Sequence, residues 1–110
     1  MTQIARLIGP MTLLGTLFTG GPLYAQDTAN TGLVLARQLC SECHAVEREP
    51  ARSPNPASPS FEAIANVPGM TAMALSSALQ TSHRSMPNVL LDSNQLRSIV
   101  AYVLSLRRAN

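Results

Sequence analysis

The chain has 110 residues and a net charge of +2, which comes from eight arginines against six acidic residues, with no lysine. Aromatic side chains make up only 4% of it, and tryptophan is absent. With no run of basic residues and few rings on which bases could stack, this composition argues against nucleic acid as a partner. The length suits one small domain.

The first 25 residues have the pattern of a secretory signal peptide. A short start carrying Arg6 precedes a mostly apolar stretch, 7–18, and Ala25 offers a small residue before a cut. The apolar stretch is shorter than the roughly 20 residues that a membrane-spanning helix needs. We therefore expect a signal peptide over 1–25 and a single periplasmic domain over 26–110. An uncleaved membrane anchor is the alternative.

A mature domain that begins after Ala25 retains only Phe61 and Tyr102 as aromatic residues. A domain of this size buries a modest fraction of its surface and usually needs a further stabilising element, such as a disulfide, a metal or a bound cofactor. A disulfide between Cys40 and Cys43 would close a loop across only two residues, so it would remove little entropy from the unfolded chain. The poor core therefore favours a bound cofactor around which short helices pack.

Hydrophobic spacing close to the helical period predicts an all-α fold, and no strand pattern occurs. Asp27 or Thr28 is the expected cap of the first helix, and Thr71 that of the third. Asp92 and Gln95 resemble a capping box before the last, amphipathic helix. The predicted helices are 28–41, 61–66, 71–81 and the segment after Asp92 that ends near Arg107 and Arg108, whose charges suit a helix C-terminus.

The remaining segments are predicted to be irregular. Residues 47–60 contain four prolines, a density that no regular element survives. Because a disordered linker is improbable inside so small a domain, we expect a loop that covers one face of the cofactor. Pro68-Gly69 predicts a turn, and 82–91 a second loop.

The segment Cys40-Ser41-Glu42-Cys43-His44 is the most informative part of the chain. It has the C-x-x-C-H pattern of covalent c-type haem attachment. Two thiols three positions apart lie within one helical turn, so both can reach the vinyl groups on one side of a porphyrin. The imidazole of His44 follows directly and can ligate the iron. We predict one covalent haem c, bound through Cys40, Cys43 and His44.

Two other readings of the cysteine pair are open. A redox disulfide of thioredoxin type needs a βαβ context, which this sequence lacks. A structural zinc site needs four ligands, and the mature chain offers only Cys40, Cys43, His44 and His83. The adjacent side chains of Cys43 and His44 would be strained as joint ligands of one tetrahedral ion.

The sixth iron ligand must come from elsewhere in the chain. Met70 and Met73 lie near the start of a predicted helix, where methionine more often fills the core. Met86 lies in a loop directly before Pro87, whose fixed φ would help to hold a weakly binding thioether in place. His83 is a further candidate. We predict Met86 because of its place before Pro87, and ligation by histidine and methionine would close both axial positions and suit electron transfer.

These residues resemble the class I c-type cytochromes, specifically the small bacterial periplasmic forms. The attachment motif and the loop Met86-Pro87 carry the resemblance. It implies a cytochrome c fold, in which three to five short helices pack around one covalently bound haem. It also implies that Gly32 is the small residue where the first and last helices cross, with Tyr102 packed over it.

The resemblance further implies that the carbonyl oxygen of Pro59 accepts the Nδ1 proton of His44, which fixes the orientation of the imidazole. Pro54 and Pro56 compete for this role. The chain departs from the family in two ways: the segment between His44 and Met86 is shorter than in mitochondrial forms, and the ring of docking lysines is missing. Docking is expected to use arginines or apolar contacts around the haem edge; the arginines available are Arg48, Arg52 and Arg84.

The sequence thus predicts a one-electron carrier rather than an enzyme. Its donor and acceptor would be periplasmic or membrane redox proteins, which the sequence does not identify. Contact with the membrane is expected only through a respiratory partner or an uncleaved signal. The alternatives are a haem enzyme or gas sensor with an exchangeable sixth ligand, and a cytochrome subunit of a larger dehydrogenase.

Overall fold

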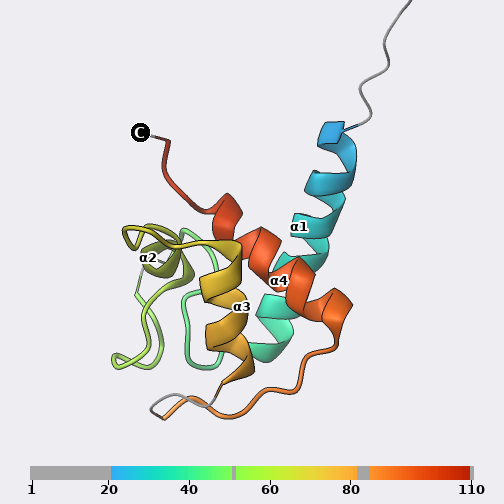
Figure 1. Cartoon of the computed structure of the whole chain (residues 1–110). Helices are drawn as coiled ribbons and strands as arrows, with labels where there is room; N and C mark the ends of the chain where they lie inside the picture. Colours follow the sequence, from blue (N-terminus) through green and yellow to red (C-terminus); the bar gives the residue numbers. More distant parts are fainter. Residues whose placement is uncertain (1–20, 51, 82–84, 110) are drawn as a thin grey trace, which may run out of the picture.

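A computed structural model describes residues 21–50, 52–81 and 85–109, and these residues form four helices and no strand. The helices are α1 (Gly21–Leu39), α2 (Phe61–Ala65), α3 (Ala72–Gln80) and α4 (Ser93–Ser105). Helices α1 and α4 cross, α3 packs on α4, and the short α2 lies away from α1 (Figure 1). The predicted all-α class is confirmed.

Helix α1 begins earlier than the sequence suggested. The prediction that Asp27 or Thr28 caps it is wrong, because the helix already begins at Gly21. The hydroxyl of Thr28 donates to the carbonyl oxygen of Tyr24 at 2.9 Å, a bond between successive turns of a helix. Proline is tolerated in a first helical turn because its missing N–H has no partner there, so Pro22 does not prevent this start.

The predicted signal peptide cannot be judged from this fold. Residues 1–20, which include its charged start and its apolar stretch, lie outside the described residues. Ala25, the expected cleavage point, lies inside α1. Cleavage there would remove the first turn of the helix and leave the buried part of α1, which begins at Ala29, intact.

Side-chain caps fix the starts of α3 and α4 as predicted. The hydroxyl of Thr71 accepts from the backbone N–H of Ala74 at 3.1 Å. Asp92 accepts from the backbone N–H of Gln95 at 2.9 Å, and the Gln95 side chain accepts from the N–H of Asp92 at 3.0 Å. This reciprocal pair is a capping box, so both helix starts are set locally.

A tight turn joins α2 to α3. The N–H of Met70 donates to the carbonyl oxygen of Val67 at 3.0 Å, with Pro68 and Gly69 between them. Gly69 has a φ of 76°, which side chains disfavour and glycine tolerates. Proline followed by glycine with positive φ is typical of a type II turn, so the predicted turn is confirmed.

The closest contact in the fold is the crossing of α1 and α4 at Gly32. A Cβ added to Gly32 would lie 1.9 Å from the carbonyl oxygen of Ser98 and 2.7 Å from the Cβ of Tyr102. Only glycine lets the two backbones approach so closely. The hydroxyl of Tyr102 donates to the carbonyl oxygen of Val46 at 2.7 Å, which ties α4 to the segment after α1. The crossing that the resemblance implies is thus present.

The core lies along the inner face of α4. Ile99 and Val103 are its largest fully buried side chains, and Phe61 and Tyr102 are both buried beside them. In the described parts of 47–60 no helix or strand occurs, as predicted from the prolines. The small core leaves the opposite side of Ile99 and Val103 facing a cavity.

Candidate cofactor site

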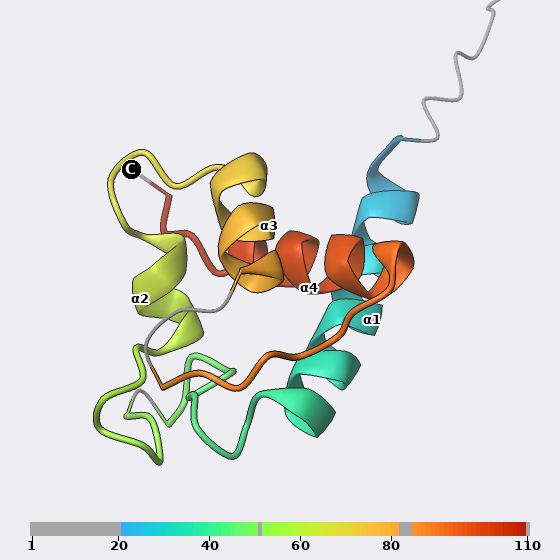
Figure 2. The same cartoon turned by 60° about the horizontal axis from the view of Figure 1, so that its bottom comes forward.

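A cavity of about 760 Å³ opens between the four helices and the loops that join them. Residues at the end of α1 form one side of it, and residues 85–89 form another. Figure 2 shows the segment that contains 85–89 leading into the start of α4. Helices α2, α3 and α4 each contribute apolar side chains to it. The apolar lining residues in these helices include Phe61, Ile64, Leu75, Leu79, Ile99 and Val103. The five residues predicted to bind the cofactor, Cys40, Cys43, His44, Pro59 and Met86, all line this cavity.

The two cysteines lie on a turn that continues directly from α1. The N–H of Cys40 donates to the carbonyl oxygen of Ala36 at 2.9 Å, and the N–H of His44 donates to that of Cys40 at 2.9 Å. Both thiols are free. Burial raises the pKa of the Cys40 thiol. Catalytic redox thiols have a lowered pKa, so this environment does not favour the thioredoxin alternative.

The imidazole of His44 is fixed by one backbone oxygen. Its Nδ1 lies 2.6 Å from the carbonyl oxygen of Pro59. A carbonyl oxygen can only accept, so Nδ1 must carry the proton. In neutral imidazole the other nitrogen, Nε2, then has its lone pair available for a metal. The contact that the resemblance implies is made by Pro59, and neither Pro54 nor Pro56 lines the cavity.

The aromatic ring of Phe61 supports the same histidine from the side. The ring centroids of His44 and Phe61 are 5.5 Å apart, with the planes tilted by 50°. The N–H of Phe61 donates to the carbonyl oxygen of Ala45 at 2.9 Å. The start of α2 is therefore joined to the histidine by a ring contact and to the next residue, Ala45, by a backbone hydrogen bond.

The proline-rich loop is tied to the motif by contacts that sequence analysis missed. The hydroxyl of Ser53 accepts from the N–H of Ala45 at 3.0 Å, and the N–H of Asn55 donates to the carbonyl oxygen of Cys43 at 3.2 Å. The Asn55 side chain also accepts from the N–H of Ala57 at 3.0 Å, which forms a local turn. The density of prolines predicted an irregular loop, but not what that loop would contact.

The candidate methionine ligands differ in their position relative to the cavity. Met86 and Met70 both line the cavity, although the sequence placed Met70 only in a core-filling role. Met73 is 83% exposed on α3, which removes it from the candidate ligands. His83 lies outside the described residues. Met86 and Met70 thus both lie in the cavity wall, and the binding of iron by Met86 stays a prediction.

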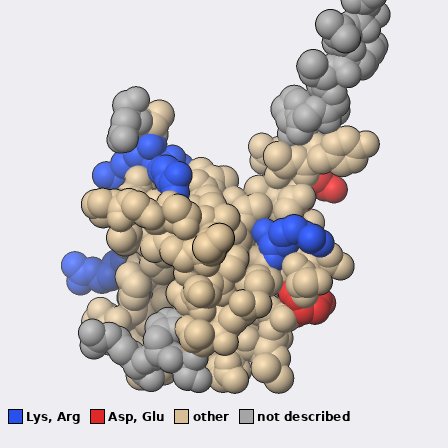
Figure 3. Space-filling model, viewed as in Figure 1, with Lys and Arg blue, Asp and Glu red and all other residues tan. Residues whose placement is uncertain are grey.

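Charge is scarce around this site. Among the described residues that line the cavity, only Glu42 carries a charged side chain. The face seen in Figure 3 is largely uncharged, and arginines gather near the C-terminal end of α4. Of the arginines considered for docking, Arg48 is paired with Glu62, and Arg84 lies outside the described residues. A surface with so few charges favours apolar contact with a partner.

The donor set and the cavity fit a covalently attached haem. The volume falls within the range of about 300–1,000 Å³ that is common for cofactor sites, and the wall is mainly apolar. Two thiols stand on one side of it, and the imidazole of His44 has one nitrogen left for a metal. These side chains would hold a flat apolar ring at its edge and its iron at the centre.

An ion pair joins α1 to the segment that follows the motif. Nε and Nη2 of Arg37 lie 2.8 and 2.9 Å from the two carboxylate oxygens of Glu47. The hydrogen bond from Arg37 is the largest cause of a lowered pKa at Glu47. Both side chains are substantially exposed, so solvent weakens the pair.

The lowered pKa of Glu47 predicts a pH dependence of stability. The pair stabilises the fold above the ordinary glutamate pKa of about 4.3, and this contribution is lost as the pH falls through the lower value in the folded protein. Glu47→Gln should therefore lose less stability than the native protein between pH 5 and pH 2, by a small amount because both side chains of the pair are exposed to solvent. Urea unfolding at several pH values measures this. Glu49→Gln is the control, and an equal pH dependence in E47Q and the native protein contradicts the prediction.

The described residues contain no group of three or more His, Cys, Asp or Glu side chains placed to hold a metal ion. Within the same part of the chain, no helix has both the length and the hydrophobicity to cross a bilayer. Comparison with protein-family models, with curated proteins and with solved structures gives no match. The function of the chain is therefore to be judged from its cavity and from the residues that line it.

Proposed function

We propose that this chain is a one-electron carrier with a single covalently attached c-type haem, built on a cytochrome c fold of class I. The observation that carries the proposal is the hydrogen bond from Nδ1 of His44 to Pro59, at the wall of a cavity that Cys40 and Cys43 share. It directs the free nitrogen of His44 to a metal beside two thiols that can form thioethers. No other described cavity combines these groups.

Each site residue has a distinct task in this proposal. Cys40 and Cys43 would hold the haem covalently, and His44, whose orientation Pro59 maintains, would bind the iron. Met86, from the loop before α4, would bind it as well. The group would supply one-electron redox chemistry at this site. Apolar side chains of α2, α3 and α4 would keep water away from the ring. Without mobile water beside it, the surroundings of the iron would rearrange little when the charge of the iron changes.

The cellular location of the proposed carrier is inferred from the sequence alone. The signal-peptide pattern of 1–25 and the attachment motif are both expected of a protein exported to the periplasm. Its partners would be a redox donor and a redox acceptor. The uncharged surroundings of the cavity support contact through apolar surface rather than through a ring of lysines.

The assignment of Met86 is tested by Met86→Ala. The native ferric protein should show the weak far-red absorption band that arises from sulfur bound to iron, and M86A should lack it. Met73→Ala is the matched control, because Met73 points away from the cavity and its loss should leave the band unchanged. A native protein without the band contradicts ligation by methionine.

Carbon monoxide separates the carrier from a haem enzyme or sensor. With both axial positions filled, the native ferrous protein should not bind carbon monoxide at neutral pH, whereas M86A should bind it readily. Binding by the native protein would instead identify an exchangeable sixth ligand. Absence of any haem in the purified protein would reject the proposed function itself.

A further inference from the structure

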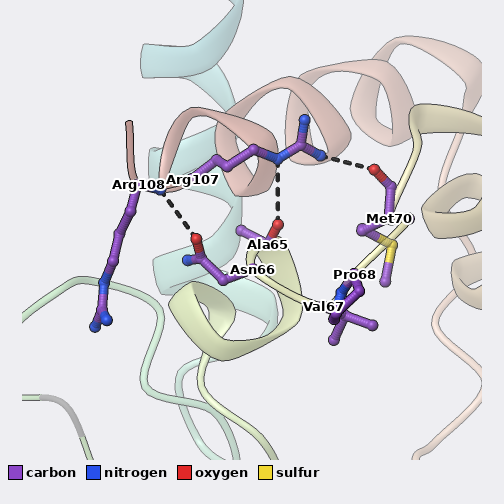
Figure 4. A pocket seen from close by; sticks show the side chains of 8 residues that line it. Ala65, Asn66, Val67, Pro68, Met70, Arg107 and Arg108 are labelled. Atoms are coloured by element: carbon purple, nitrogen blue, oxygen red, sulfur yellow. Dashed lines mark hydrogen bonds between the residues drawn. The ribbon is translucent and has the colours of Figure 1, made fainter. Parts of the chain in front are cut away.

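Arg107, directly after the last turn of α4, holds together two segments that are distant in sequence. Its Nη2 donates to the carbonyl oxygen of Met70 at 2.7 Å, and its Nε lies 3.3 Å from the carbonyl oxygen of Ala65 (Figure 4). Ala65 ends α2, so its carbonyl has no partner further along that helix. One guanidinium thus bridges the end of α2 and the residue that precedes the cap of α3.

A second set of contacts surrounds this bridge. The N–H of Arg108 donates to the Asn66 side chain at 3.0 Å, and its Nε lies 3.1 Å from a carboxylate oxygen of Glu62. The same oxygen of Glu62 accepts from Arg48 at 3.0 Å. The Glu62 side chain is 17% exposed, against 72% for Arg108, so the acid is the sheltered centre of the cluster. Together these bonds tie the C-terminal segment to α2.

The bridge is continuous with the wall of the large cavity. Met70, whose carbonyl oxygen Arg107 holds, lines that cavity and packs against the core. Between Arg107 and the turn at 66–70 lies a second, smaller cavity of about 310 Å³. Because this space gives the turn no packed support on that side, its position depends on the hydrogen bonds that Arg107 makes.

We propose that Arg107 is a positioning residue for the haem cavity. Its two hydrogen bonds keep Met70 in the cavity wall, and its charge, which is exposed to solvent on the outer side of that wall, favours the reduced state of the bound haem. Reduction lowers the positive charge of the iron, so a fixed cation nearby stabilises the reduced form. The effect on the reduced state rests on the proposed function, whereas the placement of Met70 does not.

Arginine is specifically suited to this task. Its planar fork directs N–H groups toward two acceptors at once, whereas a lysine ammonium is a point charge on a flexible stem. Arg107→Lys therefore keeps the charge and loses the bridge, and Arg107→Gln loses both. Arg97→Gln is the control, because Arg97 lies in α4 and bonds to Asn94 of the same helix, away from the 66–70 turn.

Native-state hydrogen exchange of the purified protein tests the positioning role. The amide of Met70, which donates to Val67, should exchange about tenfold faster in both R107Q and R107K, and at the native rate in R97Q. The amides of Ile99 and Val103 report global unfolding, so a rise confined to Met70 identifies a local effect. Unchanged exchange at Met70, or an equal rise at all three amides, overturns the positioning role.

Equilibrium redox titration against a mediator dye tests the effect of the charge. At a fixed solution potential, the ratio of reduced to oxidised protein should fall on the order of threefold in R107Q, and remain near the native ratio in R107K and R97Q. Equal ratios in R107Q and R97Q overturn the charge effect. If the native protein carries no haem, the proposed function fails instead, and hydrogen exchange at Met70 still decides whether Arg107 positions the turn.

Discussion

The double variant Cys40→Ala, Cys43→Ala is expected to lose covalent haem and, with it, a stable fold. The cavity of about 760 Å³ is lined mainly by apolar side chains and would have no permanent occupant. An apolar cleft without an occupant leaves its lining side chains without packing partners, and this loss destabilises the fold. A domain is stable by only about 5–15 kcal/mol, so a loss of a few kcal/mol is decisive.

Mass spectrometry and circular dichroism check this result. The native protein should carry the mass of one haem that denaturation does not remove, and the double variant should lack that mass and much of its helical signal at 37 °C. Glu42→Gln is the control, since it changes the same motif and leaves both thiols in place. A double variant as helical and as heat-stable as the native protein would show that the cavity needs no cofactor.

Gly32→Ala is the second large effect that we expect. The added Cβ would lie 1.9 Å from the carbonyl oxygen of Ser98, which is backbone of α4 and cannot turn aside. The two helices must therefore separate. Overpacking of this kind usually lowers the free energy of unfolding by about 1–3 kcal/mol or more. This exceeds the roughly 1 kcal/mol that alanine gains over glycine inside a helix.

Urea unfolding of the holoprotein measures the effect of G32A. Asn30→Ala, two residues earlier on an exposed position of the same helix, should leave the unfolding midpoint near the native value. This control separates the general effect of alanine in α1 from the specific contact with α4. A midpoint in G32A equal to or above that of N30A would mean that the helices do not meet closely at this position.

Local signals in the sequence predicted most of the helices. The capping box of Asp92 and Gln95 and the cap at Thr71 involve residues three apart, so the pattern alone contains the contact. The start of α1 was missed because Asp27 and Thr28 are both favourable caps, whereas the helix begins at Gly21, where Pro22 suits a first turn. Contacts between residues close in sequence are therefore predictable, except where a residue such as proline can either end a helix or stand in its first turn.

The site was harder to predict because its parts come from distant segments. The motif named Cys40, Cys43 and His44, and spacing alone could not place Met86 in the same cavity. Arg107 was interpreted only as a charge suited to a helix end, whereas it binds carbonyl oxygens of residues 42 and 37 positions earlier. Backbone acceptors have no sequence signature, so such a contact is visible only in three dimensions.

The crossing at Gly32 has a consequence for the order of folding. It joins the first helix to the last, so 65 residues of the sequence lie between Gly32 and Ser98. Contacts of such high contact order form slowly, because a long loop must close before they contribute. The cavity cannot close until α4 docks, and the two thiols, which come early in the chain, stay accessible until then. In the proposed haem protein, attachment of the haem would therefore precede folding, and the ring would serve as the nucleus on which the later helices condense.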